Sequence, residues 1–593
     1  MAFDAFVLNA VAREIEENII KNGGRLNRIY QLNPREVLLY FRGEVPLQPL
    51  FISIHAQRGR LNFTDRHFSH PLTPPPFCML ARKHLVNGLL VSLEQPPLER
   101  VLYLHFSVLN ARGQRVQKTL AVEIMGRHSN LVLLDTPDEE NKQIILGALK
   151  PIPPSINRYR VLLPNHLYLP PPPQEKLHPY ALSYEHFCQE INRLQGRPAA
   201  RALLENLQGF SPFLTAEIAA RADSANLTAA DAPILWQKMQ ELIEIYQEGK
   251  WEPVLFLDQK NRPADYHVLR PAQPLPGNCR FSPSISALLD EFYIFQEKNE
   301  KRKTLFTMLS RVVEQTLKKN RRKEKNQLRE LAGAAKADFY RQCGELLLIN
   351  LKQIPNNSKE VRLKNAFQEK EEFIKIKLDP QISPSLNAQR YFRKYRKARQ
   401  GEKKIAAQLR KTRREITYLE SVFFALEKTD LGVLQEIREE LIATGYLPAP
   451  SKTPAKKTGK KLFPLKFVSS QGEEILAGQN NLQNEHLVHQ LAAKTDLWLH
   501  VKDLPGAHVV VKSEEPRQET ILEAALLAAY YSRGAHSSNV PVDYTQVKNV
   551  RRLGNKPGMV TYSNFKTMYV TPHREKLQAI LNKDLKNKKQ PEI

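Results

Sequence analysis

A stretch late in the chain, residues 494–512, brings together side chains that suit contacts with nucleic acid. Residues 497–499 and 509–511 are apolar in the manner of strands, and residues 503–506 between them favour a turn, so a β-hairpin is expected. An aromatic ring, two imidazoles and two cations can stack on bases and contact phosphates. The same residues can instead fill a small β core, and their types leave both interpretations open. The polar and aromatic side chains concerned are Trp498, His500, Lys502, Asp503, His508 and Lys512.

The charge balance of the 593-residue chain indicates a polyanionic partner. The chain has 88 Lys and Arg residues against 62 Asp and Glu residues, a formal net charge of +26. Nucleic acid is the first expectation and an anionic membrane surface the second. A basic balance alone predicts no sequence specificity.

Other chemistries find little support in the sequence. The four cysteines, Cys78, Cys188, Cys279 and Cys343, lie far apart, so neither a zinc module nor a disulfide framework is expected. No Gly-rich phosphate loop of the Walker type is found, and His486 and His489 are too weak a pattern to predict a metal site. The first residues do not resemble a signal peptide, and no apolar run approaches the ~18 residues of a membrane span. A cytoplasmic protein without metal or cofactor is expected.

Residues 1–180 are expected to form a mixed α/β domain. Apolar residues at helical spacing between Phe6 and Ile19 predict a first helix that ends at Gly23–Gly24. A cationic helix is expected over 77–87. Short β-branched or aromatic runs separated by polar or Pro-rich turns predict a sheet or sandwich with flanking helices. The predicted strands are 36–41, 50–55, 101–106, 118–124 and 131–135.

Two parts of the chain resemble the NFACT family of ribosome quality-control factors. The run Asp496-Leu-Trp-Leu-His-Val-Lys-Asp-Leu-Pro-Gly-Ala-His508 is similar to the signature of the RNA-binding NFACT-R domain, and motifs at 477–484, 540–552, 556–562 and 566–572 extend the similarity. Residues 1–180 resemble the NFACT-N domain. That resemblance rests on Met1-Ala-Phe-Asp4, Pro75–His84, Leu98-Glu-Arg100, Glu123–Asn130 and Arg158–Pro164.

The NFACT-N resemblance implies both a fold and a set of tRNA contacts. In the family this domain is similar to the N-terminal domain of formamidopyrimidine-DNA glycosylases, but those enzymes use an N-terminal proline amine, and this chain begins Met-Ala-Phe-Asp. Glycosylase chemistry is therefore not expected. The family usually has Asp-Arg where this chain has Glu99-Arg100, a pair implicated in tRNA handling during untemplated tail addition. Taken without the resemblance, an acid beside an Arg is most often a surface ion pair of little energetic value. The tRNA-binding residues implied are Asp4, Glu99, Arg100, Glu123, Ile124, Met125, Arg127, His128 and Asn130.

Residues 181–280 are expected to be mainly helical, with helices over 199–207, 213–222 and 233–249. The short turn 207–213 between the first two is typical of a helix-hairpin-helix module, whose backbone amides can hold a phosphate. Plain packing of two helices is the alternative interpretation. A small β excursion is expected over 251–277.

Residues 281–450 are expected to form a long antiparallel coiled coil with the family's middle segment, turning near 355–385. Apolar residues at 305, 308, 309, 312 and 317 have helical spacing, and a heptad seam with one polar interruption, Thr412, runs over 405–426. Between residues 297 and 330 there are 12 Lys/Arg against 5 Asp/Glu, and between 390 and 414 there are 12 Lys/Arg against Glu402 alone. Residues 318–329 would lie beside 403–414, and two cationic helices should repel each other unless an anion neutralises them. A solvated charged face is the alternative. The proposed ribosome-contacting residues are Lys318, Lys319, Arg321, Arg322, Lys323, Arg393, Lys394, Arg396 and Lys397.

The expected protein is an α+β multidomain chain: NFACT-N (1–180), a helix-hairpin-helix region (181–280), the coiled coil (281–450), a basic linker (451–461), NFACT-R (462–575) and a basic tail (576–593). The resemblance implies a factor that binds a large ribosomal subunit obstructed by peptidyl-tRNA. It would contact rRNA and recruit tRNA, specifically alanyl-tRNA, to extend the stalled chain with an alanine tail that marks it for proteolysis. It would not be an enzyme, because peptide transfer would belong to the ribosome, and no small-molecule substrate or membrane partner is expected. The alternatives are a fibronectin-binding surface adhesin and a DNA-binding protein of the glycosylase-like fold.

Overall fold

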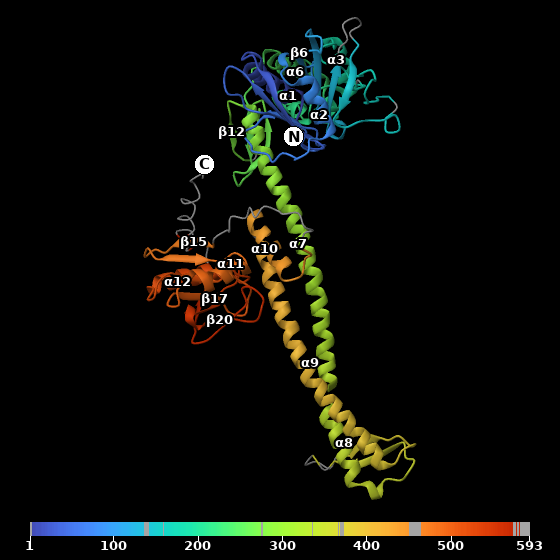
Figure 1. Cartoon of the computed structure of the whole chain (residues 1–593), viewed down its shortest axis with the longest axis vertical. Coiled ribbons are helices and arrows are strands. Elements are labelled where there is room, and N and C mark those ends of the chain that lie inside the picture. Colours follow the sequence, from blue (N-terminus) through green and yellow to red (C-terminus); the bar gives the residue numbers. More distant parts are fainter. Residues whose placement is uncertain are drawn as a thin grey trace. The chain divides into compact units, whose positions relative to one another are not determined.

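The computed structural model divides into two compact units, Met1–Glu297 and Lys298–Ile593, each with its own cores (Figure 1). The basic linker expected at 451–461 lies outside the described residues, as do Arg158 and most of the expected tail. The structure describes residues 3–135, 142–157, 159–172, 174–273, 277–334, 336–365, 367, 373–427, 429–449, 464–572, 577 and 580.

A nine-stranded sheet forms the centre of the first unit, in the order β4-β3-β2-β1-β5-β6-β7-β8-β9. Five strands match the predicted ones, and β1, β4, β5 and β9 were not predicted. In β1 the sequence Arg-Leu-Asn-Arg-Ile-Tyr-Gln-Leu-Asn is too polar for the apolar-run criterion, although its buried residues face the core. The strand bounds are β1 Arg25–Asn33, β2 Glu36–Arg42, β3 Leu50–Ser53, β4 Arg60–Phe63, β5 Leu89–Glu94, β6 Val101–Leu109, β7 Arg115–Glu123, β8 Asn130–Asp135 and β9 Ile144–Ala148.

Helices complete the core of the first unit. The first helix, α1 (Ala5–Ile15), continues in a π-helical turn to Ile20, before the predicted stop at Gly23–Gly24. On α1, Phe6 has no exposed surface, and its ring lies 5.1 Å from the Tyr246 ring and 6.2 Å from the Phe210 ring. This aromatic cluster joins α1 to the helical region that follows the sheet. The other helices are α2 Pro76–Leu85, α3 Tyr184–Arg193, α4 Ala199–Asn206, α5 Pro212–Arg221 and α6 Ala232–Glu248.

The predicted β excursion is a three-stranded sheet in the order β11-β10-β12, formed by β10 Val254–Leu257, β11 Pro263–His267 and β12 Cys279–Phe281. Directly after it, α7 (Ile285–Ala334) begins inside the first unit. The Glu14 carboxylate on α1 accepts hydrogen bonds from the Ile285 amide at 2.7 Å and the Ser284 hydroxyl at 2.8 Å. The first amides of a helix have no partner inside it, so Glu14 satisfies part of this helix end.

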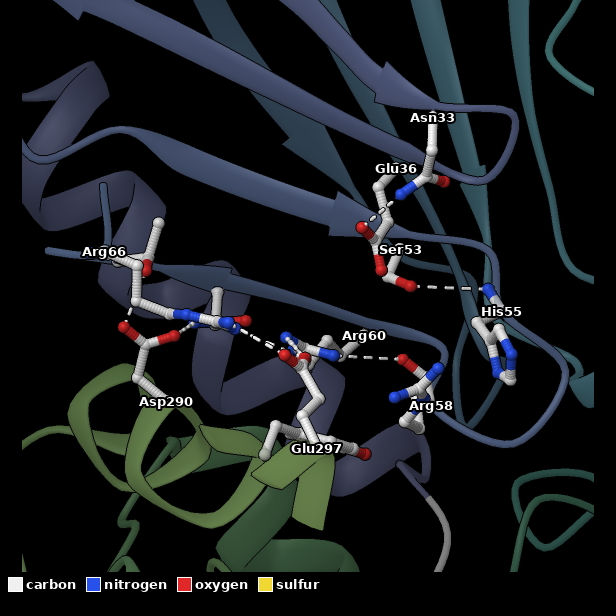
Figure 2. Close-up of polar contacts among 12 residues, drawn as sticks. Asn33, Glu36, Ser53, His55, Arg58, Arg60, Arg66, Asp290 and Glu297 are labelled. Atoms are coloured by element: carbon white, nitrogen blue, oxygen red, sulfur yellow. Dashed lines mark hydrogen bonds and ion pairs between the residues drawn. The ribbon is translucent and has the colours of Figure 1, made fainter. Parts of the chain in front are cut away.

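A buried ion cluster fixes the first turns of α7 to the edge of the large sheet (Figure 2). Arg60 on β4 is 1% exposed, and its guanidinium lies between the rings of Phe51 and Tyr293, 4.5 and 4.2 Å from their centroids. It contacts Glu297 at 3.3 Å, and Arg66 contacts the other oxygen of Glu297 at 2.8 Å. Burial alone would raise the pKa of Glu297, but the two arginines outweigh it and the pKa lies below its usual value.

The second unit contains the expected antiparallel pair of long helices, α7 and α9 (Pro384–Glu427), which lie side by side in Figure 1. Leu409, Thr412, Ile416 and Leu419 of the predicted seam are buried, whereas Met308 of the predicted α7 seam is 40% exposed. Leu309 and Leu317 of the predicted α7 residues are buried as expected, but Val313 faces the core in place of Val312. The helix α10 (Leu431–Ala443), which was not predicted, packs on this pair and completes a three-helix core.

Ion pairs between the two long helices reduce the repulsion that was predicted between their cationic stretches. Arg321 contacts Glu420 at 2.7 Å, and Arg413 contacts Glu324 at 2.8 Å. These contacts confirm that the two helices run antiparallel and close together, although Glu420 lies beyond the predicted partner stretch 403–414. They also show that two acidic residues neutralise part of the charge within the chain itself.

The far end of the helical pair is a small α+β module, not a simple turn. Helix α8 (Ala337–Ile349) packs on the start of α9, and a two-stranded sheet, β13 (Glu360–Lys364) with β14 (Phe373–Lys377), closes the module. Tyr391 on α9 donates a hydrogen bond to the Lys377 carbonyl at 2.7 Å. The predicted turn region therefore has its own buried core.

The C-terminal part of the second unit is a six-stranded sheet in the order β15-β16-β18-β17-β19-β22, with a separate β20–β21 ladder. The predicted hairpin is confirmed, because β17 pairs antiparallel with β18 from Leu497↔Val511 to Leu499↔Val509. The expected architecture is confirmed at the level of an α+β chain with a large sheet, a long helix and a C-terminal sheet domain. The elements are β15 Leu465–Val468, β16 Glu474–Ala477, α11 Asn481–His486, β17 Leu497–Val501, β18 Val509–Val511, α12 Gln518–Tyr530, β19 Val540–Gln546, β20 Val550–Arg552, β21 Val560–Tyr562 and β22 Lys566–Val570.

Candidate nucleic-acid interface

A polar pocket of about 210 Å³ lies in the first unit where the turn before β6 meets the turn between α4 and α5. Four of the predicted tRNA-binding residues line it, and they come from three separate places in the sequence. Cations also reach the pocket, which suits an anionic ligand. The lining residues are Asp4, Leu98, Glu99, Arg100, Met125, Gln174, Lys176, Gly209, Phe210, Ser211 and Pro212.

Asp4 lies at this pocket but is engaged in the fold. Its carboxylate accepts hydrogen bonds from the Phe6 and Val7 amides at 3.1 Å, which caps α1, and it contacts the His267 ring at 3.1 Å. Burial alone would raise the pKa of Asp4, but the His267 contact and the hydrogen bonds outweigh it and lower the pKa. Asp4 therefore holds the start of α1 beside the pocket as an ionised group.

Glu99 and Arg100 are half-buried at the mouth of the pocket. The Gln208 amide donates to the Glu99 carboxylate at 2.5 Å, and the Ile124 amide donates to the Arg100 carbonyl at 2.9 Å. Among the described residues, no hydrogen-bond or ion-pair partner is found for the Arg100 guanidinium, which leaves its donors available to an anionic ligand.

Glu123 is not at the surface. It is fully buried at the end of β7, where Arg160 binds it through both guanidinium nitrogens and Tyr168 donates a hydrogen bond at 2.8 Å. Burial alone would lower the pKa of Arg160, but Glu123 outweighs it and raises the pKa. The prediction that this carboxylate contacts tRNA does not fit its burial.

Two neighbours of Glu123 are also buried. Ile124 is 3% exposed, and the Asn130 side chain bonds to the Lys150 backbone at 2.8 and 3.0 Å. Arg127 and His128 differ, because both are exposed on the short turn between β7 and β8. Of the predicted residues after β7, Met125, Arg127 and His128 are therefore the ones that a ligand can reach.

Sequence reasoning missed Lys176, which lines the pocket, and Gln208, which binds the lining residue Glu99. Lys176 follows the Pro-rich segment and donates to the Leu204 carbonyl at 2.7 Å. Gln208 lies in the turn 207–213 that the sequence singles out, but nothing in the sequence connects it to a carboxylate 109 residues away.

In the C-terminal domain the predicted RNA-binding set is divided between the interior and the surface. Trp498 has no exposed surface and packs against the rings of Tyr562 and His508, at 4.8 and 5.4 Å. Lys512 is bound to Asp496 at 2.8 Å. A ring buried in this way cannot stack on a base, so the core interpretation of Trp498 and His508 fits the structure better than direct contact.

The two imidazoles of this hairpin are held neutral. Burial lowers the pKa of His500 to about 4, and burial together with the nearby His500 lowers the pKa of His508 well below its usual value. Neither ring carries positive charge at neutral pH, so they offer no phosphate contact of the ion-pair type.

The exposed part of the hairpin meets an aromatic residue that the sequence pattern did not single out. Lys502 and Asp503 are exposed, and the Lys502 ammonium lies 5.7 Å from the centre of the Phe565 ring. Phe565 is 43% exposed, and Lys566 beside it is also exposed. An exposed ring with one cation near its face and a second cation next to it in the sequence can bind single-stranded RNA by stacking and phosphate contact.

All nine proposed ribosome-contacting residues of the coiled coil are exposed. Arg321 is paired with Glu420, and the Lys394 ammonium lies 4.9 Å from the centre of the Tyr391 ring. The five residues from 318 to 323 follow one another on α7, and the four from 393 to 397 lie on α9 near the small end module.

Within the described ranges, no group of His, Cys, Asp and Glu side chains has the arrangement of a metal site, and no helix is long and apolar enough to cross a membrane. His486, considered above as half of a weak pattern, contacts Gln490 at 2.7 Å.

Known proteins match nearly the whole length of this chain. Residues 4–460 match the family model of the NFACT N-terminal and middle domains, and residues 464–564 match that of the NFACT protein RNA binding domain. The Rqc2 homolog RqcH of Bacillus subtilis (strain 168) is 35% identical over 576 residues, which are 96% of this chain and 98% of the relative. The Rqc2 homolog RqcH of Streptococcus suis (strain 05ZYH33) is 35% identical over 587 residues, 98% of this chain and 100% of the relative.

Solved structures also resemble parts of the chain. The C-terminal of the fibronectin/fibrinogen-binding protein from Streptococcus suis is 36% identical and covers 47% of this chain and 98% of its own, with a TM-score of 0.38. The fibrinogen binding protein from Staphylococcus aureus is 26% identical and covers 49% and 99%, with a TM-score of 0.42. Because the family models match both halves of the sequence and the RqcH relatives match almost all of it, this chain belongs to the NFACT family.

Proposed function

We propose that this factor of ribosome-associated quality control binds a large ribosomal subunit obstructed by peptidyl-tRNA and recruits alanyl-tRNA to it. The full-length similarity to RqcH supports the assignment to quality control. The single observation that carries the tRNA role is the polar pocket in which Arg100 has a guanidinium without a partner in the described part of the chain. An RNA phosphate is the ligand whose charge and geometry suit such a group.

The chain would supply binding and positioning, not bond-making groups. In alanine tailing, the amine of alanyl-tRNA attacks the ester carbonyl of peptidyl-tRNA, a peptide bond forms, and the earlier tRNA leaves. That chemistry belongs to the peptidyl-transfer centre of the ribosome. The repeated outcome would be a C-terminal alanine tail that marks the stalled chain for proteolysis, in the cytoplasm.

We assign the contacts by exposure and by free donors. Arg100, Met125, Arg127 and His128 would face tRNA, with Asp4, Glu99, Glu123, Ile124 and Asn130 shaping that surface from below. In NFACT-R the RNA surface would be formed by Lys502, Asp503, Phe565 and Lys566 over the buried Trp498. The exposed cations of α7 and α9 would grip rRNA.

Two finer structural expectations belong to the same proposal. The first unit would share the glycosylase-like fold of NFACT-N, and the α4–α5 pair would be a helix-hairpin-helix module. Both are supported by the residues that carry the family resemblance and by the short glycine-containing turn between α4 and α5. The domain boundaries 1–180, 181–280, 281–450 and 462–575 are proposed on the same ground.

The deciding experiment is sequencing of RNA that co-purifies with the tagged full-length protein from its own cells, for the parent and for Arg100→Ala. We expect large-subunit rRNA with an enriched alanine tRNA in the parent, and loss of the tRNA alone in Arg100→Ala. Arg112→Ala is the matched control, because Arg112 is exposed in the same unit but lies away from the pocket. Parent protein without tRNA would contradict recruitment.

A surface adhesin is the second candidate, because two relatives of solved structure have fibronectin- or fibrinogen-binding names. The experiment above separates it from the first. An adhesin, or a DNA-binding protein, would carry neither rRNA nor tRNA from the cell.

A further inference from the structure

The turn that carries Glu99 and Arg100 has an unfavourable backbone conformation. Leu98 has a φ of +59°, a region that an L-residue with a branched side chain rarely occupies, and it is 2% exposed. Its amide donates a hydrogen bond to the Tyr246 hydroxyl of α6 at 3.3 Å. The conformation persists only if surrounding groups hold it.

The turn between α4 and α5 supplies one of those groups. Gly209 has a φ of +79°, and a Cβ atom at this position would lie 2.5 Å from the Leu98 Cβ and 2.8 Å from its carbonyl oxygen. Only glycine allows so close an approach of the two backbones. The α4–α5 turn is therefore pressed directly against the residue that precedes Glu99.

The neighbouring residue of the same turn holds the carboxylate. Gln208 is 8% exposed, its own amide is fixed to the Leu177 carbonyl at 2.9 Å, and its side-chain amide donates to Glu99 at 2.5 Å. A second glutamine, Gln95, donates to the Glu99 carbonyl at 2.9 Å. Hydrogen bonds to an ionised acceptor are among the stronger ones in proteins.

The contact with Gln208 occupies the carboxylate of Glu99. While Gln208 holds the Glu99 carboxylate, the Arg100 guanidinium beside it stays without an ion-pair partner among the described residues. Without Gln208, the freed carboxylate would have a cation next to it in the sequence, and pairing of the two would withdraw Arg100 from a phosphate.

We infer that Gln208 and Gly209 make the α4–α5 turn a positioning element for tRNA binding, with Gln208 holding Glu99 away so that Arg100 meets the RNA. This inference rests on the proposed function and deepens it. It assigns Glu99 a role as the anchor of the turn, not as an RNA contact. It also explains the longer side chain at position 99, since an Asp would end one methylene short of Gln208.

The test is a set of side-chain changes in the full-length protein, measured as the affinity for labelled bulk tRNA at one salt concentration. Gln208→Leu removes the donor at nearly constant size and should weaken binding about tenfold or more. Glu99→Gln should bind nearly as well as the parent, because the Gln208 amide can still donate to the carbonyl oxygen of the substituted side chain.

The double variant Glu99→Gln with Gln208→Leu distinguishes positioning from stability. It has no carboxylate to capture Arg100, so its affinity should recover most of the loss, whereas a loss caused by general destabilisation would not be rescued. Gln208→Asn, which keeps an amide but is shorter, should weaken binding like Gln208→Leu and serves if the leucine variant does not fold.

Gln237→Leu is the matched control. Gln237 donates to Glu241 at 3.2 Å on the exposed face of α6, a contact of the same type away from the pocket, and its loss should leave the affinity unchanged. Unchanged affinity in Gln208→Leu and Gln208→Asn while Arg100→Ala abolishes binding would overturn the positioning role and leave the proposed function intact. Failure of the double variant to recover would overturn it as well. Unchanged tRNA binding in Arg100→Ala would instead count against the proposed function itself.

Discussion

Glu440 on α10 is an ionisable group placed where water cannot reach it. It is 1% exposed and accepts hydrogen bonds from the Tyr418 hydroxyl at 2.7 Å and from the Asn481 amide at 3.0 Å, both on one carboxylate oxygen. The other oxygen, Oε2, has no hydrogen-bond partner in the described structure. Burial raises the pKa of Glu440 to about 7, against the lowering effect of these hydrogen bonds. These hydrogen bonds join α10 and α9 to α11 of the C-terminal domain. The stability of that junction should therefore depend on the protonation of Glu440.

The stability contributed by Glu440 should fall as pH rises. Because its folded-state pKa lies above the usual 4.5, the folded protein binds the proton more tightly than the unfolded chain. The contribution is fully present below pH 4.5 and is lost as pH rises through about 7, on the order of 3 kcal/mol in total. Glu440→Gln mimics the protonated acid, so α10 and α11 should exchange their amide hydrogens more slowly than in the parent at about pH 8.5 and equally at about pH 4.

The neighbouring Glu439→Gln is the control for this change, because Glu439 is exposed on the same helix turn. It should alter hydrogen exchange at neither pH. Equal exchange of Glu440→Gln and the parent at the higher pH would show that the junction does not depend on this proton.

The helix α7 is a single element of 50 residues whose first turns belong to the first unit and whose remainder belongs to the second. Its anchorage is polar: Asp290 accepts from Thr64 at 2.6 Å and from Asn62 at 3.2 Å, and Glu297 binds Arg60 and Arg66. Such a buried network fixes the position of the first turns of α7 against the sheet, because each polar group meets its partner in only one placement of the helix.

Breaking that anchorage at Glu297 should be costly. Glu297→Ala leaves the Arg60 guanidinium buried without its carboxylate, which is expected to lower the free energy of unfolding of the first unit by about 3–5 kcal/mol. Urea unfolding followed by tryptophan fluorescence measures this, since Trp236 and Trp251 both lie in that unit.

Glu291→Ala on the same helix provides the comparison. Glu291 pairs with Arg280 in a contact where the two side chains are 46% and 55% exposed, so its removal should change stability by no more than about 1 kcal/mol. A similar loss of unfolding free energy in the two variants would mean that the buried ion cluster stabilises the first unit no more than an exposed ion pair does.

The whole molecule carries a net charge of +26, and much of it lies on exposed positions of α7 and α9. Two interhelical ion pairs neutralise part of this charge, but most of the exposed cations of the 318–323 and 393–397 segments have no acidic partner in the described structure. A phosphate backbone is the partner that would neutralise the remainder, and binding of this kind weakens steeply with salt.

Salt dependence of binding to purified large ribosomal subunits tests this view. Replacing Lys318, Lys319, Arg322 and Lys323 by Gln, with the paired Arg321 retained, should flatten the slope of log affinity against log salt by up to about three units. An unchanged slope would favour the alternative interpretation, in which the cations of α7 form a solvated charged face. A control with the same loss of charge replaces the exposed residues Arg25, Arg28, Arg112 and Arg115 of the first unit.

The sequence by itself determined the elements whose pattern is local. The heptad seam around Leu409 to Leu426, the hairpin of residues 497–511 and the first helix follow from apolar spacing and turn residues, which act over a few residues. The order of the domains along the chain was predicted from the family motifs. Strands such as β1, whose polar positions interrupt the apolar pattern, were missed because their burial depends on which strands pair beside them.

Only the tertiary structure decided which of the chemically suitable residues are exposed and unpaired, and so able to contact a ligand. Trp498 and Glu123 are residue types expected in a binding site. Tyr562, 64 residues away in the sequence, packs on the Trp498 ring, and Arg160, 37 residues away, neutralises the Glu123 carboxylate. Gln208 has no distinguishing type or spacing, and its importance comes from a contact with Glu99 across 109 residues. Burial and partnership are properties of contacts between distant segments, and the local pattern of a chain carries no record of them.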